Sequence, residues 1–450
     1  MATEPAKAIG PLPPSEQQTP PTTASRYYVL ALLVLINVLS YVDRHMLPAF
    51  AAQITVELDL SRQQFGLLTG FAFVAVYALS GPVMGVLADR FNPSRVIAWG
   101  IALWSAMTWL TGLSRNFLQI LLPRMAVGIG EATLHPAAAG ILGRLFAPSQ
   151  RATVFGLFFM GSHIGLGLAY WLAGTLGEAI GWRMMFMTLG AAGLLLALVL
   201  VASARFKPKS FAPPVDPAGE GDSAAASAGT VVRALIASVR GNAAFRQAVL
   251  GISLLHAIYA SGQFMQLWLV TEKGLPESTA SSLYGSVYLL CAIPAAMLGG
   301  LAADWFARRF HTTHALFVAL VGAATWPLVI LFRVAVPESA SFYLGMGATV
   351  FLLAFPYGAM ISLVLNEAPR SIQSTAIAFT MFAANVLVIG TGTYAIGLFS
   401  DLLEAQQVAA PLTKALLGAD LVVLVAIMLY FRLHRTIQSR QSNAEQPVSA

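Results

Sequence analysis

The chain has 450 residues, of which 57% are hydrophobic and only 10% are charged. A soluble protein carries roughly a quarter of its residues as Asp, Glu, Lys or Arg, so this composition excludes a water-soluble globular protein and indicates one solvated by lipid. The net charge of +6 arises from basic residues scattered between apolar runs, which excludes a nucleic-acid-binding surface.

The chain begins in a polar segment, and twelve apolar runs follow it. Residues 1–25 are rich in Pro, Thr and Ala and lack the apolar core of a signal peptide, so we expect a disordered cytoplasmic tail. Each later run is roughly 20 residues long, which is enough to cross a bilayer. The predicted spans are 27–50, 64–88, 96–114, 117–143, 152–174, 184–204, 247–271, 279–303, 313–332, 341–365, 372–398 and 412–431.

A single long polar segment, 205–245, divides these spans six and six. The sequence therefore predicts an all-α membrane protein of about twelve transmembrane helices in two halves, 26–204 and 246–433. A polar tail, 434–450, follows the second half, and we expect it to be disordered as well. Most of the 26 Lys and Arg residues fall on the cytoplasmic side if the N-terminus is cytoplasmic, so both termini and the linker are predicted inside the cell.

The two halves also repeat a short pattern. Gly85 and Asp89 close the second span, and Gly300 and Asp304 close the eighth span with the same offset. Two six-helix repeats of this kind are typical of a transporter whose substrate site lies between the halves. The glycine-rich stretches 161–174 and 390–397 predict close packing of the fifth and eleventh spans against their neighbours.

Residues 81–95 read Gly-Pro-Val-Met-Gly-Val-Leu-Ala-Asp-Arg-Phe-Asn-Pro-Ser-Arg. This segment resembles the signature between spans two and three of the major facilitator superfamily, although Asn92-Pro93 replace the usual Gly and basic residue. The resemblance implies the major facilitator fold, with spans one, four, seven and ten lining a cavity. It also implies a cytoplasmic gate that involves Asp89, Arg90, Arg95 and Asp304, in which Asp89 faces the start of span eleven near Ser371.

Two shorter segments narrow the resemblance. Ser40-Tyr41-Val42-Asp43-Arg44 and Gly128-Ile129-Gly130-Glu131-Ala132 are similar to segments of the Spinster family of lysolipid and sphingolipid transporters. Ser40 departs from the Asn that often precedes the Tyr in that family. This resemblance implies an amphiphilic lipid as the substrate, a lysophospholipid or a sphingosine-phosphate-like molecule.

Four ionisable residues fall inside the predicted spans of the first half: Asp43, Arg44, Arg124 and Glu131. Such a group costs roughly 2.5–3.5 kcal/mol to insert, so it is expected to serve a function. At ~1.5 Å per residue, Asp43 and Glu131 lie ~25 Å and ~23 Å from the cytoplasmic ends of their spans, which are similar depths. His135 continues the face of Glu131 by one helical turn.

We interpret Glu131 or Asp43 as the proton carrier, and Arg44, Arg124 and His135 as substrate or ion-pair residues. The alternative is a purely structural cluster that joins the first and fourth spans. Residue type alone does not decide which acid takes up the proton. His163 and His256 are interpreted as packed histidines, and Asp420 as a residue near the outer surface or at a misplaced span boundary.

We therefore expect a proton-coupled secondary transporter of an amphiphilic lipid, with a drug or a small organic anion as the alternative substrate. An ATP-driven pump would require a Gly-x-x-x-x-Gly-Lys-Ser/Thr loop, and a zinc protease a His-Glu-x-x-His motif; the sequence has neither. An intramembrane lipid-modifying enzyme is the rival class. We expect no cofactor, metal or catalytic residue. The expected partners are the lipid substrate, protons and membrane lipids but no nucleic acid, and the protein is expected to be a monomer in a bacterial inner membrane.

Overall fold

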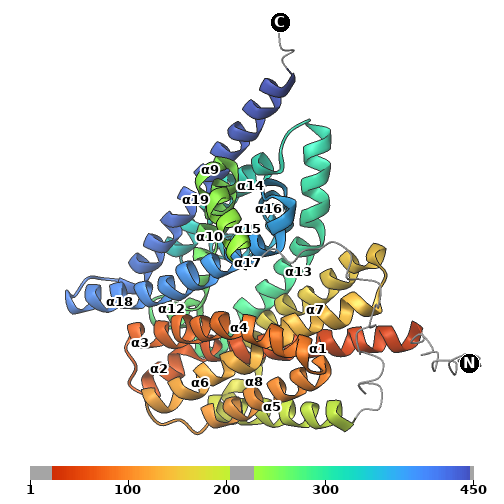
Figure 1. Ribbon diagram of the computed structural model, residues 1–450. Helices are drawn as coiled ribbons and strands as arrows, with labels where there is room; N and C mark the ends of the chain where they lie inside the picture. Colours follow the sequence, from red (N-terminus) through yellow and green to blue (C-terminus); the bar gives the residue numbers. More distant parts are fainter. Residues whose placement is uncertain (1–22, 203–227, 446–450) are drawn as a thin grey trace, which may run out of the picture.

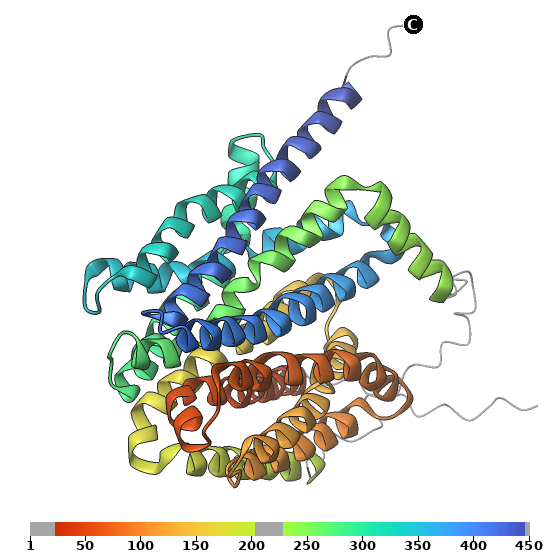
Figure 2. The same ribbon diagram turned by 90° about the vertical axis from the view of Figure 1, so that its left-hand side faces the viewer.

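The computed structural model describes residues 23–202 and 228–445, and all its regular elements in these ranges are helices (Figures 1 and 2). The helices of the first half are α1 (Thr23–Ala49), α2 (Ala51–Glu57), α3 (Arg62–Gly66), η1 (Leu67–Phe71), α4 (Ala72–Arg90), α5 (Pro93–Thr111), α6 (Phe117–Glu131), α7 (Leu134–Leu145) and α8 (Pro148–Ala202).

The second half begins with α9 (Ala228–Gly241), which lies inside the predicted linker. The remaining helices are α10 (Ala243–Leu255), α11 (Ala257–Gly262), α12 (Met265–Thr271), α13 (Glu277–Arg309), α14 (His314–Val334), α15 (Ala340–Ala354), α16 (Tyr357–Glu367), η4 (Arg370–Ile372), α17 (Gln373–Phe382), η5 (Ala383–Gly390), α18 (Thr391–Ala405) and α19 (Pro411–Glu445).

The helices account for the twelve predicted spans. Ten helical stretches of the described ranges are long and apolar enough to cross a membrane. One of them contains α8, whose 55 residues would extend ~80 Å as a single helix, far more than one bilayer crossing. Gly181 breaks α8 with a φ of 72°, a conformation that favours glycine, and this break separates spans five and six. The 19-residue α5 supplies span three.

The C-terminal tail differs from its prediction in one respect. Residues 434–445 are helical, because α19 continues past the membrane as far as Glu445. Contacts with the second half hold this extension: the Thr436 hydroxyl donates to Gln247, and the Arg440 guanidinium pairs with Glu367 at 3.1 Å and donates to Asn242. Polarity alone does not reveal such contacts. Residues 1–22, 203–227 and 446–450 lie outside the described part.

The two halves share one core at one end of the molecule only. We call this end, which lies opposite the start of α1, the distal end, and the other the proximal end. The shared core combines residues such as Phe50 and Trp182 of the first half with Trp268 and Phe342 of the second. Toward the proximal end each half has its own core. Figure 2 shows the corresponding arrangement, in which the two sets of helices meet at one side and diverge toward the other.

Close backbone contacts and hydrogen bonds close the distal end. A Cβ atom on Gly174 of α8 would lie 2.2 Å from the Ser282 nitrogen of α13, so only glycine permits this approach, as the glycine-rich stretch predicts. The Ala52 amide donates to Gln266 Oε1 at 2.8 Å, and the Ser281 hydroxyl donates to the Ala49 carbonyl at 2.8 Å. The outer surface of the bundle carries exposed apolar side chains, such as Leu198 and Leu290, as lipid-facing helices require.

Candidate functional site

An ion pair between α1 and α6 forms the centre of the candidate site. Both Nε and the Nη2 nitrogen of Arg44 donate to Glu131 Oε2, at 3.0 Å and 2.5 Å. Glu131 is the last residue of α6, where the span breaks before α7 begins at Leu134. The Glu131 side chain is fully buried, whereas 18% of the Arg44 side chain remains exposed. Arg44 is thus the member of this pair that a solute can reach.

Aromatic rings surround the Arg44 guanidinium. The Arg44 Cζ atom lies 4.7 Å from the ring centre of Tyr41, 4.8 Å from Phe73 and 4.9 Å from Tyr77. Such contacts stabilise a partly desolvated cation. The Tyr77 hydroxyl also lies 3.0 Å from His135 Nδ1. His135 therefore contacts one of the rings around Arg44.

The other two charges complete a buried four-residue cluster behind Arg44. Thr108 of α5 donates to Asp43 Oδ2 at 2.7 Å, and Arg124 Nη2 donates to the Arg44 carbonyl oxygen at 2.6 Å. The Arg124 Cζ atom also lies 4.6 Å from the ring centre of Phe73, the same ring that contacts Arg44. The structure therefore brings together the four charges that the sequence singled out, and the cluster links α1, α5 and α6.

Three buried polar atoms of this cluster have no hydrogen-bond partner in the described part of the chain. They are Asp43 Oδ1, Glu131 Oε1 and Arg124 Nε. Buried polar atoms are nearly always paired, so each free atom calls for an explanation. An ordered water or a substrate group would satisfy them, and a proton on either carboxyl group would remove the negative charge that makes its free oxygen costly to bury. The cluster can therefore bind a proton, a water molecule or a substrate group in addition to joining the helices.

The three predicted gate residues whose side chains the structure describes, Arg90, Arg95 and Asp304, do not form one group in this conformation. The side chains of Asp89 and Ser371 lie outside the described part. Asp304 pairs with His314 Nε2 of its own half at 3.0 Å. Arg90 is exposed at the end of α4, and Arg95 is exposed on α5 beside a groove lined wholly by residues of the first half.

The two further histidines are packed among aromatic residues, as expected. His256 Nδ1 donates to the Ile252 carbonyl at 2.7 Å and lies beside Tyr259 and Tyr357. His163 is stacked on Tyr288 of the opposite half, with ring centres 6.4 Å apart. Among the described residues, no group of three His, Cys, Asp or Glu residues is placed to hold a metal ion.

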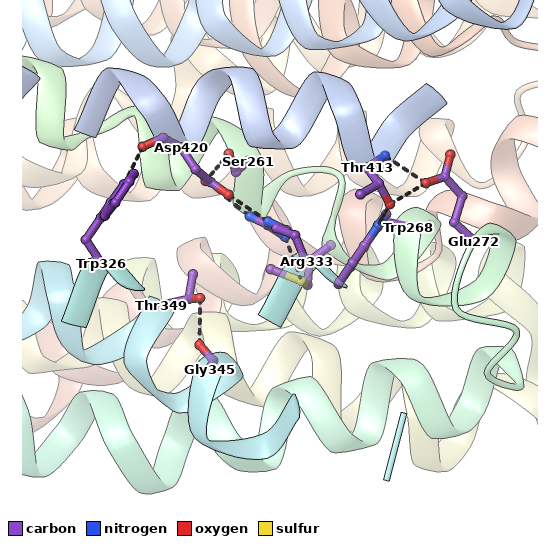
Figure 3. Close-up of polar contacts among 10 residues, drawn as sticks. Ser261, Trp268, Glu272, Trp326, Arg333, Gly345, Thr349, Thr413 and Asp420 are labelled. Carbon is purple, nitrogen blue, oxygen red and sulfur yellow. Dashed lines mark hydrogen bonds and ion pairs between the residues drawn. The ribbon is translucent and has the colours of Figure 1, made fainter. Parts of the chain in front are cut away.

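The sequence interpretation of Asp420 is wrong. Asp420 is fully buried and pairs with the equally buried Arg333, whose Nε lies 2.7 Å from Asp420 Oδ2 (Figure 3). Ser261 of α11 donates to the same carboxylate at 3.3 Å, and Trp326 Nε1 donates to the Asp420 carbonyl at 2.8 Å. Asp420 lies ~14 Å from the start of α19, so the rule that intramembrane charges require partners would have identified it. The first half therefore does not supply all of the buried charge.

Two six-span halves, with a buried charged cluster inside the first, have the architecture of a multi-pass membrane transporter. The chain belongs to the Major Facilitator Superfamily, whose sequence profile matches residues 33–393. It also resembles the Spinster family, and similar proteins with known names or structures support that resemblance.

Two named relatives and one solved structure illustrate the proteins to which the chain is similar. An MFS-type efflux pump of Mycolicibacterium smegmatis is 28% identical over 86% of this chain and 87% of its own length. The sphingosine-1-phosphate transporter SPNS2 of Xenopus tropicalis is 24% identical over 84% of this chain and 75% of its own. The crystal structure of a bacterial homologue of the human lysosomal transporter Spinster, inward-facing and unoccupied, superposes with a TM-score of 0.79 at 23% identity, covering 93% of this chain and 99% of that one.

Proposed function

We propose that this transporter moves a single-chain amphiphile with an anionic headgroup, a lysophospholipid or a sphingosine-phosphate-like lipid, by proton-coupled alternating access. The observation that supports this most strongly is Arg44. It is a partly exposed guanidinium, surrounded by three aromatic rings and held by a fully buried carboxylate. A guanidinium binds phosphate oxygens with two parallel hydrogen bonds.

The Arg44–Glu131 pair provides the coupling in this proposal. A proton on Glu131 weakens its attraction for Arg44 and frees the guanidinium for the substrate phosphate. When the phosphate leaves, the carboxyl group loses its proton and pairs with Arg44 again. Asp43, with one unpaired carboxylate oxygen, is the second acid that can carry the proton. Arg124 and His135 hold Arg44 and its aromatic neighbours in position.

The second half offers an aromatic surface that faces α1. Tyr259 of α11 lines a cavity together with His45, the residue after Arg44. Tyr259 and Tyr357 of α16 both pack against His256. Phe351 and Phe355 of the tenth span are stacked, with ring centres 4.3 Å apart. An acyl chain can lie along such a surface, whereas a sugar needs more hydrogen-bonding groups. The name of the SPNS2 relative supports the same substrate class.

The predicted orientation assigns the two ends. With both termini cytoplasmic, the closed distal end faces outward and the protein is inward-open, so substrate reaches Arg44 from the cytoplasm. Asp89, Arg90, Arg95 and Asp304 then form the gate that closes in the opposite state. We propose a monomer in a bacterial inner membrane.

The test is uptake of a lysophospholipid series, with and without the phosphate, into proteoliposomes under an imposed pH gradient. Arg44→Lys loses the two parallel bonds, so half-maximal uptake of the phosphate-bearing lipids should need about tenfold more lipid. Arg44→Ala should need the highest lipid concentration. Arg115→Ala, an exposed residue outside the cluster, is the matched control. Equal affinity for lipids without phosphate would refute the headgroup assignment.

The efflux-pump relative supports a second candidate, export of a drug or a small organic anion. The same proteoliposomes distinguish the two candidates. If cationic drugs or organic anions are transported while lysolipids are not, the substrate class is wrong and only the superfamily assignment stands.

A further inference from the structure

A groove on the outside of the first half lies apart from the proposed transport site. It has a volume of about 460 Å³, within the range of ligand-binding pockets. Helices α4, α5 and α6 form it, and its apolar wall includes Leu87, Val96, Leu103 and Ile129. The groove therefore opens toward lipid rather than toward the second half.

The groove is as deep as one leaflet of a membrane. It runs along α5 from Asn92, just before the helix begins, to Leu103. These residues are separated by ~16 Å along the helix axis, and half of a bilayer's hydrocarbon core measures ~15 Å. An acyl chain that enters at the membrane surface thus ends near the bilayer centre.

The shallow end of the groove carries a charged residue and aromatic rings. Arg95 lies there, exposed, and its guanidinium makes no hydrogen bond or ion pair with any side chain that the structure describes. Trp99 and Phe91 beside it are 77% and 63% exposed. Exposed aromatic rings at this level are typical of the lipid headgroup region, and a guanidinium suits a phosphate.

We propose that this groove binds one phospholipid of the proximal leaflet, with its phosphate on Arg95 and an acyl chain along Val96, Leu103 and Ile129. The charge of the unpaired guanidinium complements the phosphate, and the apolar wall below it complements the chain. The occupant is a structural lipid of the membrane, distinct from the transported amphiphile that contacts Arg44.

The bound chain contacts the segment that positions Glu131. Gly130 and Thr133 form the floor of the groove, on either side of Glu131 in the sequence. A Cβ atom on Gly100 of α5 would lie 2.0 Å from Thr133 Oγ1, so α5 packs directly against this floor. The Glu131 side chain points to Arg44 of α1 on the other side of the segment. The lipid thus supports the α6–α7 break from outside.

Native mass spectrometry of the full-length protein tests the proposal. The purified protein is titrated with phosphatidylglycerol and with diacylglycerol of the same acyl chains. Phosphatidylglycerol should bind more tightly to the wild type, and Arg95→Gln should lower its affinity about fivefold, to the level of diacylglycerol. Arg308→Gln, an exposed arginine at the end of α13, should bind as the wild type does. Leu103→Trp, which fills the groove, should weaken both lipids.

Three results would overturn the proposal. The first is an Arg95→Gln variant that retains phosphatidylglycerol as the wild type does, or loses it no more than Arg308→Gln. The second is a Leu103→Trp variant with unchanged lipid binding. The third is a lipid-free dimer that Leu103→Trp converts to a monomer, because a second copy of the chain would then occupy the groove.

Discussion

Glu131 and Asp43 lie in the same cluster, but their surroundings differ. Glu131 gives one oxygen to both Arg44 donors and leaves Oε1 free, whereas Asp43 accepts from a neutral hydroxyl, that of Thr108. Only a change in the charge of Glu131 directly alters the ion pair with Arg44. Glu131 is therefore the acid whose protonation should couple most strongly to substrate binding.

The Glu131→Gln variant should lose the pH response of the conformational equilibrium between about pH 5 and about pH 8. The amide keeps the shape of the protonated acid but has no proton to gain, so the variant should stay in the acidic conformation at every pH. Distances between spin labels on the two halves measure this. Glu178→Gln, an exposed acid of α8, is the control. An unchanged response in Glu131→Gln would assign the proton to Asp43.

The Arg333–Asp420 pair joins α14 to α19, and we expect it to stabilise the second half. Arg333→Leu leaves a fully buried carboxylate without its charge partner, which should lower the free energy of unfolding by about 3–5 kcal/mol. The double variant Arg333→Leu/Asp420→Leu removes both charges and should recover most of that loss. Thermal unfolding in detergent measures both. A double variant as unstable as the single one, or one that abolishes transport while fully folded, contradicts a structural role.

The charged residues of the site could be predicted, but their partners could not. Isolated charges in two apolar spans, with Asp43 and Glu131 at similar depths, were enough to single out Asp43, Arg44, Arg124 and Glu131 as a set. The bond from Thr108 and the contact of Arg124 with the Arg44 carbonyl depend on side-chain conformations that a sequence does not encode locally. Asp420 was misjudged because its partner, Arg333, lies at the end of another span.

At the level of elements, span length was predictable and span breaks were not. Apolar runs correspond to the helices, since each must satisfy its own backbone hydrogen bonds in lipid. The fourth span breaks at 132–133, the seventh at 256 and again at 263–264, and the tenth at 355–356. Only the last break contains a proline. The π-helical segments η1 and η5 face each other across the halves, so tertiary packing shapes them.

A contact between α18 and α3 adds hydrogen bonds to the apolar packing that closes the distal end. Asp401 of α18 accepts hydrogen bonds from the backbone amides of Arg62 and Gln63, at 3.1 Å and 2.8 Å, where α3 begins. A carboxylate at a helix N-terminus satisfies free amides and is stabilised by the helix dipole. The Arg62 side chain also pairs with Glu404, a more exposed carboxylate. The second span of one half is thus capped by the eleventh span of the other.

At the scale of the whole molecule, the halves are two helix bundles joined at one end. Each has its own core at the proximal end, and only the distal core is shared. In the alternating access proposed above, moving to the opposite state requires this shared core to separate while the proximal ends approach each other. The free energy of the distal contacts therefore sets the balance between the two states.

Asp401→Ala should shift that balance toward opening of the distal end. Loss of a helix cap costs about 0.5–2 kcal/mol, which changes the ratio of the two states by roughly 2- to 30-fold. Spin labels at Gln150 and Arg309 report the proximal distance, and labels at Asn116 and Glu338 report the distal one, in a variant with Cys291 replaced by serine. The proximal distance should shorten as the distal distance lengthens. Glu404→Gln, which removes a solvent-exposed charge, should change both distances much less. If the two distances lengthen together, the halves do not rock about the central site, and Asp401 acts only on local folding.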